Sequence, residues 1–186
     1  MKKLPVVLLF LPLFCLAEAK VIENYRHYNV SASEKGRLLS ALNKASPIRE
    51  DGEIFHGHTK YHIGWKYWWK TRDKQCALTK VETTLTLTYT MPKLASASDE
   101  VKQVWDAWYP NLALHEERHG KLAKEAAASI DQKLNAIGPQ ENCRTLEKDL
   151  NKQAQAIMAE LKKANKQYDD DTNHGETEGA WLHLHL

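Results

Sequence analysis

The stretch TKYHIGWKYWW, residues 59–69, alternates between apolar and polar positions and indicates the fold most clearly. Its even-numbered positions are mostly Lys, His and Gly, and its odd-numbered positions are Thr59, Tyr61, Ile63, Trp65, Tyr67 and Trp69. An alternation with a period of two predicts a strand that buries one face and exposes the other. The odd-numbered aromatic side chains should therefore lie in the core, whereas Trp68 points the other way and could line a cleft if exposed.

A second strand is expected over residues 76–91, because apolar residues there alternate with threonines. The intervening Arg72-Asp73-Lys74 is turn-like, so the two strands should form an antiparallel hairpin. Pro92 should end the second strand, since proline cannot donate a hydrogen bond to a neighbouring strand. Residues 20–30, KVIENYRHYNV, predict a further short strand from their aromatic and β-branched content.

The first helix is expected near residues 32–45. Ser31 and Glu34 have the spacing of a capping box, and Pro47 follows as a stop signal. Asp51-Gly52 then predicts a turn.

Two long helices should make up most of the chain after Pro92. The first covers residues 97–137, where Pro110 should kink or restart it. The second should begin at Asn142, because apolar residues then recur at spacings of three and four, at Leu146, Leu150, Ala154, Ile157 and Leu161. The order of elements predicts an α+β fold, with a small antiparallel sheet followed by two long helices.

The N-terminus has the three parts of a secretory signal peptide. Lys2 and Lys3 form a short basic region, an apolar run of thirteen residues follows from Leu4 to Leu16, and residues 17–19 form an A-x-A cleavage site. We therefore expect residues 1–19 to be removed and residues 20–186 to form a single domain that is periplasmic or secreted. This cleavage would leave 24 basic and 23 acidic residues, a net charge of about +1.

The composition excludes several classes of protein. Hydrophobic residues make up 42% of the chain and charged residues 27%, which argues against extensive disorder. A net charge close to zero gives no indication of nucleic-acid binding, and no later apolar run is long enough for a membrane span. The sequence does not indicate an oligomeric state.

Two cysteines remain after the expected cleavage, Cys76 and Cys143. An even number of cysteines in an exported chain favours a disulfide, because that compartment is oxidising. The alternative, that both are zinc ligands, is weaker, since structural zinc sites usually gather four ligands.

The sequence LHEERHG, residues 114–120, contains the motif H-E-x-x-H inside the first long helix. Residues at i and i+4 share one face of a helix, so His115 and His119 can bind one metal ion. Glu116 can then take a proton from water held on that ion, as in zinc-dependent hydrolases. The alternative is a pair of exposed histidines on a charged helix face.

A catalytic zinc site needs a third protein ligand. If the second long helix packs antiparallel to the first, its C-terminal end returns toward the motif, which makes His174 a candidate third ligand. Tyr168 and the neighbouring aspartates are then candidates for supporting the ligands or for stabilising an oxyanion. The run of aspartates can also be simply solvated.

With these residues, the chain resembles the bacterial family catalogued as domain of unknown function 922, described as predicted secreted zinc-dependent proteases. The resemblance covers nearly all of the mature chain and includes Ile63-Gly64-Trp65, both cysteines, Met91-Pro92, the H-E-x-x-H motif, Tyr168-Asp169 and His174-Gly175. It implies that His174 belongs to the site.

These observations together predict an exported zinc-dependent hydrolase that acts on a peptide or protein substrate. Zn²⁺ would be held by His115, His119 and His174, with Glu116 as the general base and Tyr168 as the oxyanion donor. A strand edge beside the motif helix would allow an extended peptide to add to the sheet. The alternative is a non-catalytic periplasmic protein that binds zinc, or an interaction module in which the histidines are incidental.

Overall fold

The computed structural model describes residues 18–50 and 52–186. The expected signal peptide falls on residues 1–17 for nearly all its length and so lies outside the described residues, as does Asp51 of the expected turn. In the described part of the chain, no helix is both long enough and apolar enough to cross a membrane.

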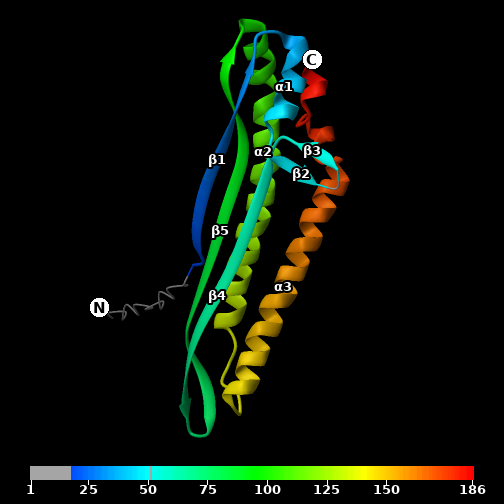
Figure 1. Cartoon of the computed structure of the whole chain (residues 1–186). Coiled ribbons are helices and arrows are strands. Elements are labelled where there is room, and N and C mark those ends of the chain that lie inside the picture. Colours follow the sequence, from blue (N-terminus) through cyan, green and yellow to red (C-terminus); the bar gives the residue numbers. More distant parts are fainter. Residues whose placement is uncertain (1–17, 51) are drawn as a thin grey trace, which may run out of the picture.

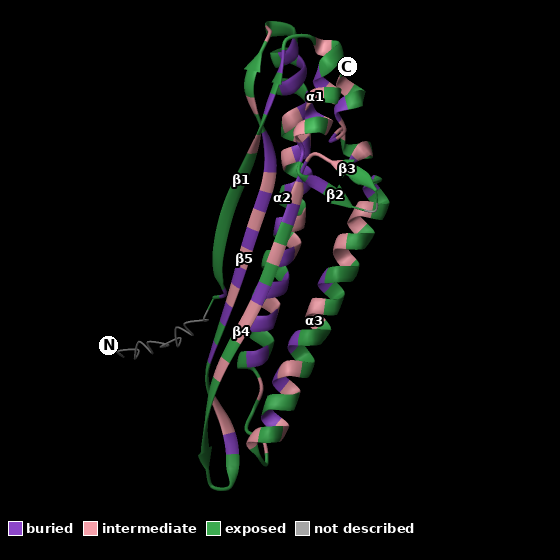
Figure 2. Cartoon of the chain, in the orientation of Figure 1, coloured by how far each residue is buried: buried purple, intermediate pink, exposed green. Residues whose placement is uncertain are grey.

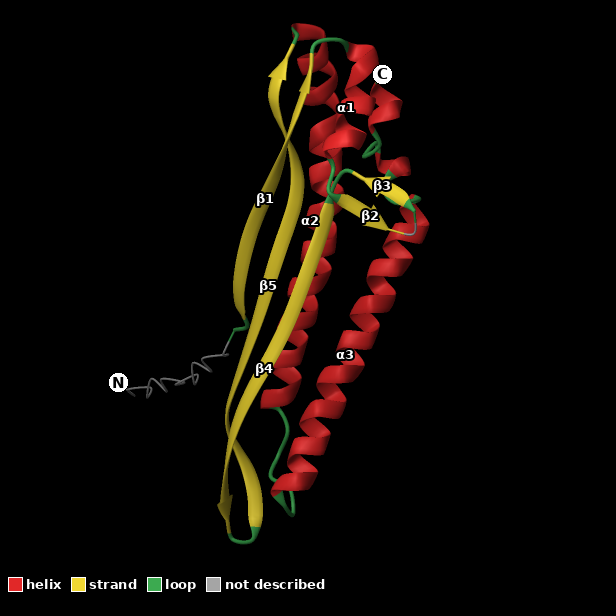
Figure 3. Ribbon diagram, viewed as in Figure 1, coloured by secondary structure: helices red, strands yellow, loops and turns green. Residues whose placement is uncertain are grey.

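The main sheet has three long strands in the order β1-β5-β4. Strands β4 (His58–Arg72) and β5 (Gln75–Ala97) form the expected antiparallel hairpin, and Asp73 and Lys74 at its turn have left-handed φ angles of 52° and 63°. Strand β1 (Lys20–Ala32), however, pairs parallel to β5. The sheet is therefore mixed, and the expectation of a purely antiparallel sheet is wrong for β1 (Figure 3).

The second strand of the hairpin does not end at Pro92, as the sequence predicted, but continues to Ala97. The pairing explains this difference, because the contact between β4 and β5 ends where His58 meets Thr90. Beyond that point β5 pairs with β1 alone, and Pro92 lies opposite Tyr28. A residue without an N–H group is tolerated where one edge of the strand is unpaired.

The first helix also begins later than predicted. Strand β1 continues to Ala32, a 3₁₀ turn follows over Lys35–Arg37, and helix α1 occupies Leu38–Ala45. Ser31 stays in the sheet, opposite Ser96 of β5, and no side chain caps the turn or the helix. Pairing with β5 therefore overrides the capping-box pattern. A small two-stranded sheet, β2 (Ile48–Glu50) with β3 (Glu53–Phe55), follows α1.

Two long helices cover one side of the main sheet and run antiparallel to each other (Figure 1). Helix α2 spans Asp99–Asn135 and continues through Pro110 as a single helix. Its N-cap is Ser98, whose side chain accepts a hydrogen bond from the Val101 amide. Helix α3 spans Cys143–Thr172 and is capped by Asn142, as predicted. Two 3₁₀ turns, Glu176–Glu178 and Leu182–His185, close the chain.

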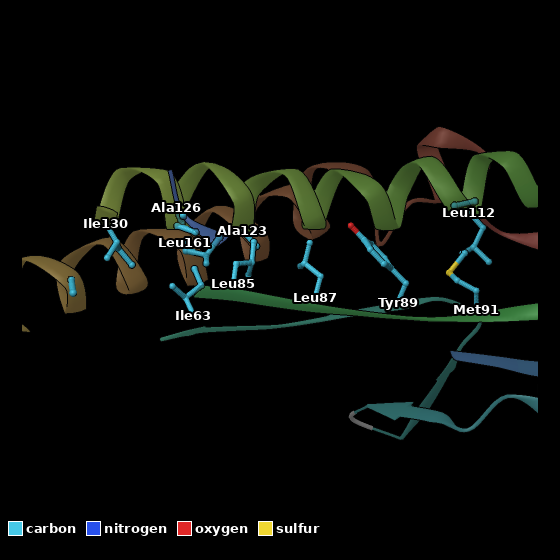
Figure 4. Packing of buried hydrophobic residues seen from close by; sticks show 14 of the residues in the cluster. Ile63, Leu85, Leu87, Tyr89, Met91, Leu112, Ala123, Ala126, Ile130 and Leu161 are labelled. Carbon is cyan, nitrogen blue, oxygen red and sulfur yellow. The ribbon is translucent and has the colours of Figure 1, made fainter. Parts of the chain in front are cut away.

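The core lies between the sheet and the long helices (Figure 2). From Val81 to Met91 the odd-numbered residues of β5 are buried against the helices, as the alternation predicted, and the threonines at even-numbered positions between them are less buried. Figure 4 shows this layer, with side chains from β4, β5 and both helices, including Ile63, Leu85, Leu87, Tyr89, Met91, Leu112, Ala123, Ala126, Ile130 and Leu161. A Cβ atom at Gly120 would lie 2.0 Å from the Tyr89 hydroxyl oxygen, so only glycine allows the helix to approach this strand so closely just after the motif.

The disulfide between Cys76 and Cys143 is confirmed, with the two Cα atoms 5.0 Å apart. It joins the start of β5 to the start of α3. Backbone hydrogen bonds between Cys76 and Gln140 reinforce the connection. The bond therefore fixes the turn end of the hairpin to the end of the helical pair.

Candidate metal centre

The two motif histidines lie on one face of α2 and direct the same ring nitrogen to the same point. The Nε2 atoms of His115 and His119 are 3.3 Å apart. The Oδ1 atom of Asp169, from the last turn of α3, lies 3.0 Å from Nε2 of His119 and 3.5 Å from Nε2 of His115. Ligands about 2.0–2.1 Å from a tetrahedral zinc ion are about 3.3 Å from one another, so the three atoms have the spacing of a zinc site.

A hydrogen bond at the other ring nitrogen fixes each histidine. Nδ1 of His119 lies 2.6 Å from Oδ1 of Asn165, and the Asn165 amide nitrogen donates to the Leu161 carbonyl, which turns its oxygen toward the ring. Nδ1 of His115 lies 3.0 Å from the Glu178 carboxylate. When Nδ1 donates to these oxygens, the lone pair of each Nε2 is left free for a metal, and such partners are usual around metal-bound histidines.

The electrostatics of the three groups agree with this arrangement. Burial lowers the pKa of both histidines, but hydrogen bonds to Asp169, and also to Glu178 for His115 and to Asn165 for His119, outweigh burial and raise it. Burial raises the pKa of the Asp169 carboxyl, but its bonds to the two histidines bring the pKa well below its usual value. Asp169 is therefore an anion that faces two imidazoles, and a metal ion at this point would replace the protons that the Nε2 atoms share with Asp169.

Glu116 is buried beside this group. It lies next to the start of β4 and to the loop that precedes this strand. Its Oε2 accepts a hydrogen bond of 2.6 Å from the Thr59 hydroxyl. A Cβ atom at Gly57 would lie only 2.6 Å from Oε1 of Glu116, so the absence of a side chain at Gly57 makes room for the carboxylate. Burial raises the pKa of Glu116 above its usual value, although the Thr59 bond and the nearby histidines oppose this change. A raised carboxyl pKa suits a group that takes and returns a proton near neutral pH.

A cavity of about 530 Å³ opens onto these side chains. His115, Glu116, His119 and Asp169 line one part of it, and the small sheet and the C-terminal segment form other walls. The cavity thus gives a ligand direct access to the three-ligand group and to the buried carboxylate.

His174 lies in the wall of the same cavity but is not one of the three converging groups. It follows the C-cap of α3 with a left-handed φ of 52°, and its ring centroid is 5.3 Å from that of Phe55. Among the described residues, the metal-ligand side chains that lie within reach of one another are His115, His119 and Asp169. The role of His174 as a ligand stays a prediction, and Asp169 occupies the position for which the sequence suggested His174.

Tyr168 packs against the face of the His115 ring. The two rings are stacked, with centroids 4.9 Å apart, and the Tyr168 hydroxyl donates to Glu178 over 2.7 Å. Burial, followed by the Glu178 contacts, raises the pKa of this hydroxyl. Tyr168 lines a smaller neighbouring cavity together with Arg118, and its predicted oxyanion role stays a prediction.

Sequence reasoning treated Asp169 only as a supporting group and did not find Asn165, Glu178, Gly57 or the contact of Thr59. One signal for Asp169 and Asn165 was present. Asn165 and Asp169 follow Leu161 at intervals of four, so they continue the apolar stripe of the second long helix on the face that meets α2.

These features define an α+β protein with a three-ligand candidate metal site on two antiparallel helices. The family model described as "Bacterial protein of unknown function (DUF922)" matches residues 25–175, and the chain belongs to this family. No curated protein and no solved structure matches the chain.

Proposed function

We propose that this protein is an exported zinc-dependent peptidase in which His115, His119 and Asp169 hold the ion and Glu116 is the general base. The observation that carries the proposal is the convergence of three ligand atoms, 3.0–3.5 Å apart, beside a buried carboxylate in an open cavity. A bound zinc ion would supply an activated water and polarise the carbonyl group of the substrate.

The residues of the chain would divide the remaining work. Glu116 takes the proton of the attacking water and passes it to the leaving amine, and Thr59 holds the carboxylate in place for this task. Asn165 and Glu178 keep the imidazoles in the orientation and tautomer that bind metal. The disulfide is compatible with export to an oxidising compartment.

Two observations support a peptide substrate and catalysis over structural metal binding. In the part of the chain that the structure describes, β4 pairs only with β5, and its residues His58, Thr59 and Tyr61 line the cavity, so its other edge can add an extended peptide. Structural zinc sites use four protein ligands, whereas a group of three among the described residues leaves one position for water.

The test uses Glu116→Gln, with Glu117→Gln as the matched control on the exposed side of the same helix turn. Each purified mature chain is analysed for zinc by elemental analysis and for cleavage of a fluorogenic peptide library. We expect all chains to bind about one zinc ion, with cleavage lost only in Glu116→Gln. Unchanged cleavage in Glu116→Gln refutes the assigned base, and absence of zinc from the wild-type chain refutes the proposal.

A further inference from the structure

The turn end of the β4–β5 hairpin, residues 66–80, combines exposed tryptophans with positive charge. Trp68 and Trp69 are 44% and 40% exposed, and both belong to this segment. The Trp69 ring lies 5.6 Å from that of Tyr67, whereas Trp68 faces Lys80, so the two tryptophans lie on opposite faces of the hairpin end. Large aromatic residues this exposed on both faces of one hairpin are unusual on a soluble surface. The cavity and the candidate metal centre do not involve either side chain.

The charge of the hairpin end differs from that of the rest of the chain. It carries five cations, Lys66, Lys70, Arg72, Lys74 and Lys80, against one acid, Asp73, which gives a net charge of +4. The mature chain as a whole has a net charge of only about +1. The remainder is therefore acidic overall, and the positive charge is concentrated at one end of the molecule.

The positive charge lies close to the aromatic surface. The Lys80 ammonium is 5.1 Å from the centre of the Trp68 ring, and it also contacts Glu82. Lys66 stands on the same face, because it lies opposite Glu82 in the hairpin, two positions along from the Trp68–Lys80 pair. Tryptophan beside lysine and arginine is the combination found at membrane–water interfaces, where the ring enters the headgroup region and the cations meet phosphates.

The position of the hairpin suits contact with a broad surface. Its turn lies at one end of the elongated molecule, beside the connection between α2 and α3 (Figure 1). The disulfide between Cys76 and Cys143 and the backbone pairing of Cys76 with Gln140 fix it to the helices. A rigid hairpin loses little conformational freedom when it binds.

We propose that the hairpin end, residues 66–80, docks the protein on an anionic lipid surface, with Trp68 and Trp69 in the headgroup region and the five cations against lipid phosphates. This surface contact is independent of the proposed peptidase activity. The docked molecule lies on the membrane and does not cross it. The charge complementarity favours an anionic over a zwitterionic bilayer, and each cation at such a surface strengthens binding about fivefold.

The experiment is co-sedimentation of the purified, disulfide-intact mature chain with vesicles of phosphatidylethanolamine and phosphatidylglycerol, compared with vesicles of phosphatidylcholine alone. Two variants remove the surface: Trp68→Ser/Trp69→Ser and Lys70→Glu/Lys74→Glu. Their matched controls are Tyr25→Ser, an exposed aromatic on β1, and Lys162→Glu/Lys163→Glu, exposed on α3. Circular dichroism checks that every variant is folded.

We expect the wild-type chain and both controls to bind the anionic vesicles, with binding weakened by high salt and absent on phosphatidylcholine. Each hairpin variant should bind at least tenfold more weakly than its control, and the tryptophan emission should shift to the blue only where binding is kept. Equal binding by hairpin variants and controls overturns the proposal, as does a wild-type chain that ignores anionic vesicles. Self-association through the hairpin, or binding to an acidic polysaccharide without binding to vesicles, also overturns it.

Discussion

Replacing Asp169 with Asn tests which side chain completes the candidate metal centre. The substitution keeps the shape of the side chain and removes the charge from the oxygen that lies 3.0 and 3.5 Å from the two Nε2 atoms. Loss of a group that only orients a ligand typically costs about 10–100-fold in metal affinity. Loss of a ligand should cost at least the upper value, about 100-fold, which is roughly 2.7 kcal/mol of binding free energy.

The matched comparison is His174→Asn, which removes the third ligand that the sequence suggested. Asparagine accepts the left-handed φ of 52° at this position, so the backbone is not strained by the change. Zinc affinity is measured for both variants by competition with a chromophoric chelator, which requires no substrate. We expect a loss of less than about tenfold for His174→Asn. A larger loss for His174→Asn than for Asp169→Asn would refute the assignment of Asp169.

Three further predictions concern the surroundings of the site and stability. Gly57→Ala should displace the Glu116 carboxylate, since the new Cβ would lie 2.6 Å from Oε1. We expect this variant to cleave peptide about 100-fold more slowly without loss of zinc. The control Gly64→Ala, whose new Cβ would have its nearest contact at 3.8 Å, should cleave normally. Replacing both cysteines of the disulfide with serine should lower the free energy of unfolding by about 4 kcal/mol in urea titrations, because the bond closes a loop of about 68 residues. A change below about 1 kcal/mol would contradict this prediction. Burial, and then the charge of Arg49, lower the pKa of His56 from 6.5 to about 4. Between these two pH values the unfolded chain binds more protons than the folded chain. The free energy of unfolding should therefore fall by about 3 kcal/mol as the pH falls through this window. His56→Gln should flatten that pH dependence, and an unchanged slope would show that another group causes it.

The parts of the fold that depend on local pattern were predictable from the sequence. The alternation over residues 59–69 and 76–91 gave the hairpin and its buried face, and Asn142 marked the start of α3. The expectation was wrong for Trp69, which was placed in the core but is 40% exposed where the hairpin extends beyond the helices. His115 and His119 share a face because the helix repeats every 3.6 residues, a relation that needs no knowledge of the rest of the chain. The pairing of Cys76 with Cys143 followed because these are the only two cysteines outside the expected signal peptide.

Where a distant segment changed the outcome, local pattern gave the wrong answer. Parallel pairing of β1 with β5 brings together residues more than sixty positions apart, and no local signal in either strand encodes the direction. The same pairing keeps Ser31 in a strand and carries β5 through Pro92. Local propensities are worth less than a network of sheet hydrogen bonds and the burial that accompanies it.

By itself, the sequence determined the two histidines and the glutamate of the motif, because their relation is internal to one helix. Only the tertiary structure decided the third converging group, because that depends on how α3 is rotated and aligned against α2. Each residue along a helix turns by about 100°, so Asp169 faces the histidines while Asp170 points outward to Lys166. Packing of the two helices and the sheet brings Asp169, Asn165, Glu178 and Thr59 to the motif, and no spacing along the chain specifies those contacts.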